Sequence, residues 1–302
     1  MKSNRLAYSG LIILAVLAVS GWMPAGQETS ASLPIHYEEL TAPLFVQAVA
    51  RSGGTCIIPL GIIEKHGEHL PLGTDLLICR EKARLAAQLE YAVVFPPYYF
   101  GQIFEARHQP GTLAYSEKLY FDLLQETCAE LARNGFHKII LYSGHGGNEH
   151  FLPYFCQTQL ASRKDYAVYL FTPAVDPEQD PEVQNLIRSA VDMHGGERET
   201  SLLLATFPQL VHLEAIKPAS GEDRKRLSSV QPFYTGIWWY ASFPDHYAGD
   251  ATVATVELGQ LLLRKQVEQL AAMIREVKQD QEVLKLQNEF FNAAGDPLAP
   301  KK

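Results

Sequence analysis

Several common sequence signals are missing from the 302 residues, and each absence excludes a class of protein. There is no dense Lys/Arg cluster and the formal net charge is −8. A nucleic-acid backbone is therefore not an expected partner, because phosphate binding needs a basic surface. No C-x-x-C pair occurs, which excludes a cysteine-based zinc site. The G-x-S-x-G elbow, the H-E-x-x-H helix and the P-loop are absent too, and with them the hydrolase and nucleotide-binding machinery that they carry.

Cysteine is scarce, with four residues whose spacings fit no small disulfide scaffold. Cys56 lies in an apolar, strand-like run and Cys128 on the apolar stripe of an expected helix, so we expect both to be buried as small hydrophobic residues. Apolar residues make up 47% and charged residues 20% of the chain, ordinary values for a globular protein. The length suffices for one large α/β domain or two small ones, and neither an internal repeat nor an interdomain linker is evident.

The N-terminus differs in character from the rest of the chain. Lys2 and Arg5 precede an apolar run, Leu11–Val19, and small and polar residues follow. This layout predicts a signal peptide over residues 1–25 and an exported protein, periplasmic or secreted, that does not contact the membrane after cleavage. The alternative is an uncleaved membrane anchor, because no charge occurs from Leu6 to Gln27.

The remainder alternates between short β-like runs and longer helical ones. The apolar runs rich in Val, Ile and aromatic residues predict buried strands at Thr55–Leu60, Ala92–Pro97, Lys138–Ser143 and Ala167–Thr172. Apolar spacing predicts helices at Leu76–Glu90, Glu117–Asn134 and Thr252–Lys278. Ser116 suits the N-cap of the second helix and Gly135 its C-terminal end. Repeated strand–helix units favour a mostly parallel sheet covered on both faces. We expect residues 33–280 to form this domain and residues 281–302 to form a C-terminal tail, frayed from Asn292 onward.

Three loops concentrate polar and metal-ligating residues. Two follow predicted strands directly, and the third precedes a short apolar run; they are residues 61–75, Ser143–Asn148 and His194–Ser201. In an open parallel sheet, ligands bind beyond the carboxyl ends of the strands. Glu64 and His66 are two residues apart, so in an extended segment their side chains leave the same side of the backbone. Imidazole and carboxylate together suit Zn, Mn or Fe.

These loops resemble the creatininase (creatinine amidohydrolase) family. The matching stretches, in order along the chain, are PLGIIEKHGEHLPLGTD (Pro59–Asp75), HQPGT (His108–Thr112), SGHGGN (Ser143–Asn148), HGGERETS (His194–Ser201) and, more weakly, GDATVATVELG (Gly249–Gly259). The resemblance implies a three-layer α/β/α sandwich with a mostly parallel sheet and a homo-oligomer, usually a hexamer. It also implies two divalent metal ions per chain.

Carried over by position, the resemblance gives each side chain a role. Glu64, Asp75 and His145 would hold one metal, and His66, Asp75 and Glu199 the other, with Asp75 as the bridge. His194 matches the catalytic histidine beside the substrate, and we interpret it as the proton donor to the leaving nitrogen. His69 matches a residue that orients a ligand.

Two departures from the family pattern concern the substrate. Members that hydrolyse creatinine have a glutamate where this chain has Gly147, which leaves no evident carboxylate other than the ligands for proton transfer. The two tryptophans that cover creatinine are also missing from the aligned segments. Trp238, Trp239 and Tyr240 could supply aromatic contacts from another loop, or could pack in the core or between subunits.

The sequence therefore predicts a dinuclear metal-dependent amidohydrolase, in which metal-activated water cleaves the C–N bond of a small amide, cyclic or linear. The alternatives are a peptide-trimming metallopeptidase of the same family and a non-catalytic metal-binding assembly protein.

Overall fold

The computed structural model describes residues 33–172, 179–217, 221–230 and 234–298. Nine α-helices occur in these ranges, with bounds α1 Ala42–Arg51, α2 Thr74–Leu89, α3 Glu117–Arg133, α4 Phe151–Thr158, α5 Pro181–Gln184, α6 Glu197–Thr206, α7 Trp238–Ser242, α8 Val256–Gln279 and α9 Val283–Gly295. The strands are β1 Thr55–Leu60, β2 Val93–Val94, β3 Lys138–Ser143, β4 Ala167–Leu170, β5 Asp192–His194 and β6 Ala248–Gly249. The expected signal peptide, residues 1–25, lies outside the described ranges. Within them, no helix is both long enough and apolar enough to cross a membrane.

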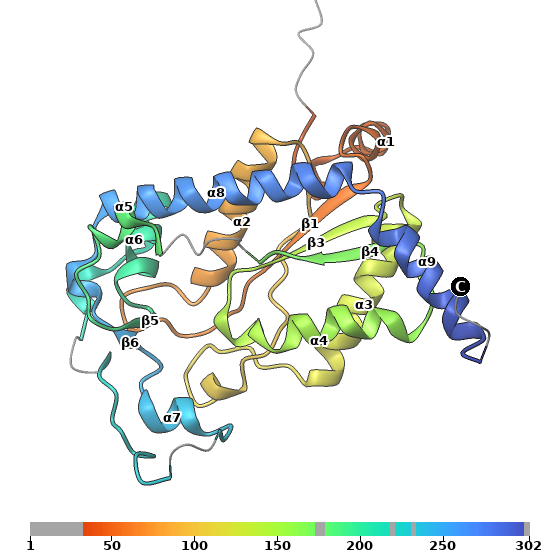
Figure 1. Cartoon of the computed structure of the whole chain (residues 1–302). Coiled ribbons are helices and arrows are strands. Elements are labelled where there is room, and N and C mark those ends of the chain that lie inside the picture. Colours follow the sequence, from red (N-terminus) through yellow and green to blue (C-terminus); the bar gives the residue numbers. More distant parts are fainter. Residues whose placement is uncertain (1–32, 173–178, 218–220, 231–233, 299–302) are drawn as a thin grey trace, which may run out of the picture. The chain divides into compact units, whose positions relative to one another are not determined.

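The main sheet is parallel and has the strand order β2-β1-β3-β4. Residues along β1 and β3 alternate between two hydrophobic clusters, as the pleat of a strand requires. Ile58 and Leu141 face the cluster formed with α1, α3 and α4, whereas Ile57 and Ile140 face the cluster formed with α2 and α8. Figure 1 shows helices on both sides of the sheet, which confirms the predicted three-layer α/β/α sandwich.

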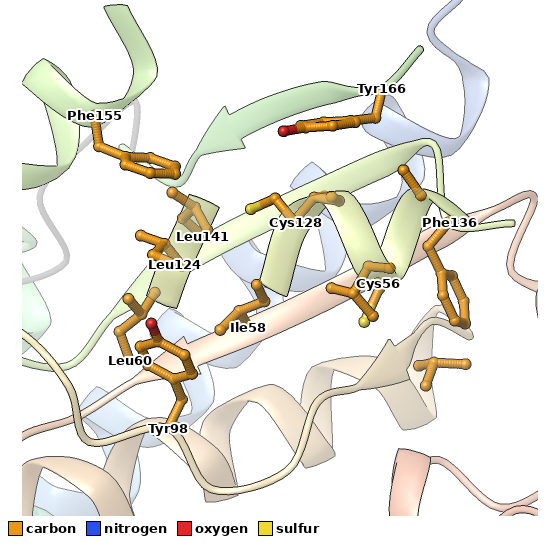
Figure 2. Close-up of a cluster of buried hydrophobic side chains, with 14 of the residues drawn as sticks. Cys56, Ile58, Leu60, Tyr98, Leu124, Cys128, Phe136, Leu141, Phe155 and Tyr166 are labelled. Carbon is orange, nitrogen blue, oxygen red and sulfur yellow. The ribbon is translucent and has the colours of Figure 1, made fainter. Parts of the chain in front are cut away.

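The first of these clusters is apolar and closely packed (Figure 2). Leu124 and Cys128 of α3 belong to the same cluster as Ile58 of β1, and all three side chains are fully buried. Cys56 belongs to the same cluster, and all four cysteines of the chain are free thiols. Burial raises the pKa of the Cys56 and Cys128 thiols. The prediction that these two cysteines serve as small core residues is confirmed.

Several predicted boundaries differ from the structure for identifiable reasons. Only Val93 and Val94 of the expected strand at residues 92–97 pair with β1, because the prolines at 96 and 97 have no N–H to donate to a ladder. The long helix begins at Val256 rather than at residue 252, with the Thr255 hydroxyl accepting a hydrogen bond from the Leu258 N–H.

The C-terminal segment also differs from expectation, because the helix α9 occupies most of what was predicted as a tail. Arg163 donates to the side chains of Asn288 and Asn292, and the Gln287 side chain donates to the Tyr166 carbonyl. Asn292, from which fraying was predicted, is thus part of a helix that is hydrogen-bonded to the domain. No residue of α9 is fully buried, so the helix lies on the surface of the domain.

The end of β1 and the start of α2 approach each other closely at Gly61. A Cβ atom there would lie 2.3 Å from the Leu76 Cα. Glycine is required at this point because it alone lets the two backbones come together. The contact fixes the first turn of α2, which contains Asp75.

We therefore expect Gly61→Ala to lower the free energy of unfolding by about 1–3 kcal/mol, because the new methyl group must displace backbone. Gly73→Ala is the matched control, since its Cβ would meet only the Ile63 Cδ1 at 3.8 Å. It should cost less than about 1 kcal/mol. Chemical denaturation of the two variants measures this, and equal losses would contradict the argument.

Candidate active site

The polar loops meet where the strand order of the sheet reverses. The chain passes from β1 to its neighbour β2 and then crosses to β3 on the other side of β1. The carboxyl ends of β1 and β3 are therefore adjacent, which is the usual ligand site of an open α/β sheet. Glu64 and His66 follow β1, and His145 follows β3. The short strand β5 contributes His194, and the first turn of α6 contributes Glu199.

Asp75 lies at the centre of this group. Its Oδ1 is 2.9 Å from the His66 Nε2, and its Oδ2 is 2.9 Å from the His145 Nδ1. One carboxylate thus faces two histidines, with one oxygen directed toward each. The helix α2 holds it there, and the side chain is 3% exposed, which keeps it largely out of bulk water.

Backbone carbonyls orient the two histidine rings. The Nδ1 of His66 lies 3.2 Å from the Glu64 carbonyl oxygen, and the Nε2 of His145 lies 2.9 Å from the Gln102 carbonyl oxygen. A carbonyl can only accept, so each of these nitrogens must be the N–H donor. The opposite ring nitrogens, which face the carboxylates, are therefore the ones available as metal ligands.

Glu64 completes the first half of the cluster. Its Oε1 lies 2.8 Å from the His145 Nδ1, the nitrogen that also lies 2.9 Å from the Asp75 Oδ2. Two carboxylates thus converge on one ring nitrogen, and when that nitrogen carries no proton the buried Glu64 Oε1 has no hydrogen-bond donor. An unsatisfied anionic oxygen of this kind is costly unless a cation binds it.

The electrostatics of the cluster are those of a cation site. Burial alone would raise the pKa of Glu64, but His145 and His194 hold it well below its ordinary range. Burial opposes protonation of His66, yet Asp75 raises its pKa to about 10. The pKa of His145 is raised well above its ordinary value by Glu64 and Asp75, again against the effect of burial. Protons on the two histidines thus supply positive charge between the carboxylates, where divalent cations would supply it instead. The residues fit a metal centre.

Glu199 and His194 complete the predicted set. The Glu199 Oε2 accepts a hydrogen bond of 2.5 Å from the Gly195 N–H and lies 3.9 Å from the His66 Nε2. His194 donates from Nε2 to the Lys65 carbonyl at 2.7 Å, which leaves Nδ1 as its exchangeable nitrogen. Its ring lies 4.2 Å from that of His66. The structure brings together all six residues singled out from the sequence.

His69 is set back from the cluster. Its Nε2 lies 2.9 Å from the Thr200 Oγ1, and that hydroxyl donates to the Gly195 carbonyl. Burial lowers the pKa of His69 to about 4, so the ring is neutral. His69 thus connects the loop after β1 to the segment that hydrogen-bonds Glu199, in keeping with the orienting role inferred for it.

His246 is a site residue that the sequence did not reveal. Its Nε2 is hydrogen-bonded to the Glu64 Oε2, and the Trp239 indole N–H donates to its Nδ1 at 2.8 Å. An indole nitrogen can only donate, so Nδ1 is unprotonated and Nε2 carries the proton that Glu64 accepts. Trp239 therefore fixes the histidine tautomer, and the histidine orients a predicted metal ligand. His246 has a φ of 52°, a strained conformation for a non-glycine residue.

Glu105 is a second residue that was missed, and it corrects the expectation that only ligand carboxylates are available. A Cβ atom on Gly147 would lie 2.4 Å from the His145 Nε2 and 3.1 Å from the Glu105 Oε1. The carboxylate of Glu105 thus lies beside the space that a side chain at 147 would enter. Burial raises the pKa of Glu105 above its ordinary value.

A cavity of about 750 Å³ opens onto the cluster. Glu64, Asp75, His145, His194 and Glu199 form one part of its wall. Aromatic side chains form another part, and these are Phe104, Tyr234, Trp238, Trp239 and Tyr240. The structure thus places the tryptophans at the cavity, the first of the two locations considered from the sequence. Glu105 also lines this cavity.

Comparison with known proteins agrees with this geometry. A model of the creatininase family, described as creatinine amidohydrolase, matches residues 38–274. The chain is 28% identical over 257 residues to creatinine amidohydrolase from Pseudomonas putida, covering 79% of this chain and 95% of that protein. It is 25% identical over 250 residues to 3-dehydro-scyllo-inosose hydrolase from Thermotoga maritima, covering 73% and 76%. It is 26% identical over 227 residues to mycofactocin precursor peptide peptidase from Mycobacterium ulcerans, covering 72% and 83%.

Solved structures agree with the sequence relatives. Creatinine amidohydrolase (creatininase) superposes with a TM-score of 0.69 at 25% identity, covering 82% of this chain and 99% of that one. A mutant creatininase of the Zn-Zn type gives a TM-score of 0.69, and a manganese creatininase gives 0.66, both at 26% identity with the same coverage. The fold and the cluster are those of a metal-dependent hydrolase that acts on C–N amide bonds. The chain belongs to the creatininase family.

The role of Trp239 can be tested with two phenylalanine substitutions. Trp239→Phe keeps an aromatic ring but removes the indole N–H, so His246 is free to change tautomer and its hydrogen bond to Glu64 weakens. Metal affinity should fall by about 10–100-fold, the usual effect of losing such a supporting contact. Chelator competition measures the affinity, and the ¹⁵N shifts of the His246 ring report the tautomer.

Trp238→Phe is the matched control, because within the described residues the Trp238 indole makes no hydrogen bond. It should leave both readings unchanged. An unaltered His246 tautomer in Trp239→Phe would refute the assignment.

Proposed function

We propose that the protein is a dinuclear metal-dependent amidohydrolase. The observation that carries this proposal is the position of Asp75, which directs one oxygen toward His66 and the other toward His145. Two ligand sets follow, Glu64–Asp75–His145 and His66–Asp75–Glu199, with Asp75 common to both. The solved relatives of the Zn-Zn and manganese types support zinc or manganese as the ions, and the same ligand types suit iron. When bound, a pair of divalent ions supplies Lewis-acid polarisation of the amide carbonyl and lowers the pKa of water.

The protein's own side chains handle the protons. Glu105 is positioned to take the proton of the attacking water, because its raised pKa makes it a better base than an ordinary carboxylate. His194 is positioned to donate a proton to the leaving nitrogen. Its Nε2 is committed to the Lys65 carbonyl, so the donated proton leaves from Nδ1.

The cavity supports an amide larger than creatinine. A volume of about 750 Å³ lies within the range of sites for drug-sized ligands, and the aromatic wall suits a flat or apolar group. A small-molecule amide is the main candidate substrate. The second candidate is the end of a short peptide, which the cavity volume and the peptidase relative both favour. A purely structural role is disfavoured, because the whole ligand set, His194 and a base are all present.

Two variants distinguish the proposed metal ligand Glu199 from the proposed proton donor His194. Glu199→Ala removes a ligand and should reduce the metal content from about two ions per chain. His194→Ala removes a proton donor, so it should keep both ions while the turnover of the amide falls by about 10²–10⁴-fold. Elemental analysis and hydrolysis assays on panels of lactams and short peptides measure these effects. A His194→Ala protein with normal turnover would rule out the assigned role.

The proposed role of Glu105 as a base can be tested by measuring kcat/KM as a function of pH. If its ionised form is the base, kcat/KM should fall as the pH drops through the raised pKa of this carboxyl. Glu105→Gln should lower kcat by about 10²–10⁴-fold and remove that acidic limb without loss of metal. Glu149→Gln, at an exposed glutamate on the same cavity, is the control and should retain the limb. An acidic limb that persists in Glu105→Gln would assign the titration to another group.

A further inference from the structure

A second cavity, of about 380 Å³, shares part of its wall with the first. The shared residues are Asp75, His145, Gly146, Met193 and Glu199. The rest of its wall comes from α2, α6, α8 and the strand ends, and is different in character. It includes Lys82, Arg198 and Gln266 and has no tryptophan. The proposed metal centre thus lies between an aromatic cavity and one whose wall contains Lys82 and Arg198.

Lys82 is the unusual residue of this second cavity. It is 7% exposed, and the described residues provide no hydrogen-bond or ion-pair partner for its ammonium group. A buried lysine without a directly bonded partner is costly, and Glu199 and Asp75 attract its charge only from a distance, without a hydrogen bond. Burial lowers the pKa of Lys82 to about 8, which still leaves the side chain mostly protonated at neutral pH.

The geometry of α2 directs this ammonium toward the metal centre. Lys82 follows Asp75 by seven residues on the same helix, so both lie on one face, separated by about 10 Å along the axis. Long side chains on a helix lean toward its N-terminus, which here is the end that carries Asp75. The ammonium therefore lies within reach of a ligand that also contacts the centre.

Once two divalent metal ions are bound, the net charge of the proposed metal centre would favour binding of an anion beside it. Two divalent cations would more than neutralise the three carboxylates of Glu64, Asp75 and Glu199. Asp192, the other carboxylate of the cavity wall, is paired with Arg198 at 3.0 Å. With those carboxylates engaged by the ions, Lys82 adds positive charge to the wall of the ligand space. The buried Gln266 Oε1, which has no donor partner, adds an acceptor for a ligand N–H.

We propose that this cavity binds a carboxylate group of the substrate, with Lys82 as its counter-ion. The inference rests on the proposed function and gives it a substrate class. The amide would lie at the metal centre, with a carboxylate a few bonds away on one side and an aromatic or apolar group in the larger cavity on the other. A single ammonium suits a monoanionic carboxylate better than a phosphate, which is typically held by several donors or a helix N-terminus.

The test is equilibrium binding to the zinc-loaded full-length chain. Calorimetry compares succinate, glutarate and adipate with butyrate, pentanoate and hexanoate, the monocarboxylates of matching length. One carboxylate can bind the centre in every case, but only a diacid can also reach Lys82. At least one diacid should bind about 10–100-fold more tightly than its monoacid, as expected for a charge-assisted contact. Lys82→Met should abolish this preference, and Lys82→Arg should retain it.

The alternative is that Lys82 only offsets the carboxylates of the centre. In that case Lys82→Met weakens monoacids and diacids equally, or the wild-type protein shows no diacid preference, and either result overturns the proposal. Removal of a cation should not weaken metal binding, so the variant should keep its zinc, which elemental analysis verifies. Diacid selectivity without amide hydrolysis would reject the proposed function and keep the subsite. Amide hydrolysis without diacid selectivity would support the proposed function and reject the carboxylate subsite.

Discussion

The position of one carboxylate, Asp75, determines most of the arrangement at the strand ends. It contacts histidines from two different loops, so the loop after β1 and the loop after β3 must converge on the first turn of α2. That convergence depends on Gly61, where a Cβ atom would collide with α2. The close approach of strand and helix is thus a packing requirement with a chemical consequence. If α2 began one turn later, the two histidines would face no common ligand.

The cluster concentrates negative charge in a place where water cannot offset it. Glu64 and Asp75 are almost fully buried, and their carboxylates lie within ion-pair distance of His66, His145 and His246. Such a group is stable only with compensating positive charge, whether from protons or from metal ions. The surrounding contacts are arranged to preserve the free nitrogens and oxygens. Backbone carbonyls accept hydrogen bonds from the His66 Nδ1 and the His145 Nε2, which leaves the opposite ring nitrogens facing the carboxylates. Trp239 sets the tautomer of His246.

Local signals in the sequence predicted the core of the fold well. The bounds of β1 and β3 agree with the prediction, because an uninterrupted apolar run is typical of a strand buried on both faces. Ser116 caps α3 as expected, since its hydroxyl accepts from the Leu119 N–H. The candidate metal ligands Glu64, His66 and His145 could be recognised because dense polar motifs follow those same strands.

His246 and Glu105 could not be recognised as site residues from the sequence. The contact of His246 with Glu64 spans 182 residues, and nothing in its own segment indicates a strand end. Glu105 lies in a short 3-10 helix, and its role becomes evident only from the space beside Gly147.

The exchange between Gly147 and Glu105 also bears on how a site of this family can change its substrate. In creatinine-hydrolysing members the glutamate two residues after the histidine stands in the loop that follows β3. Here that loop has no side chain, and a carboxylate from the cavity wall lies beside the same space. Glu105 follows Phe104, which lines the same cavity, so the proposed proton transfer and substrate contact would come from one segment. Three residues of the aromatic wall, Trp238, Trp239 and Tyr240, are likewise supplied by α7. The proposed metal-binding geometry can therefore be kept while the surfaces proposed to contact the substrate come from other parts of the chain.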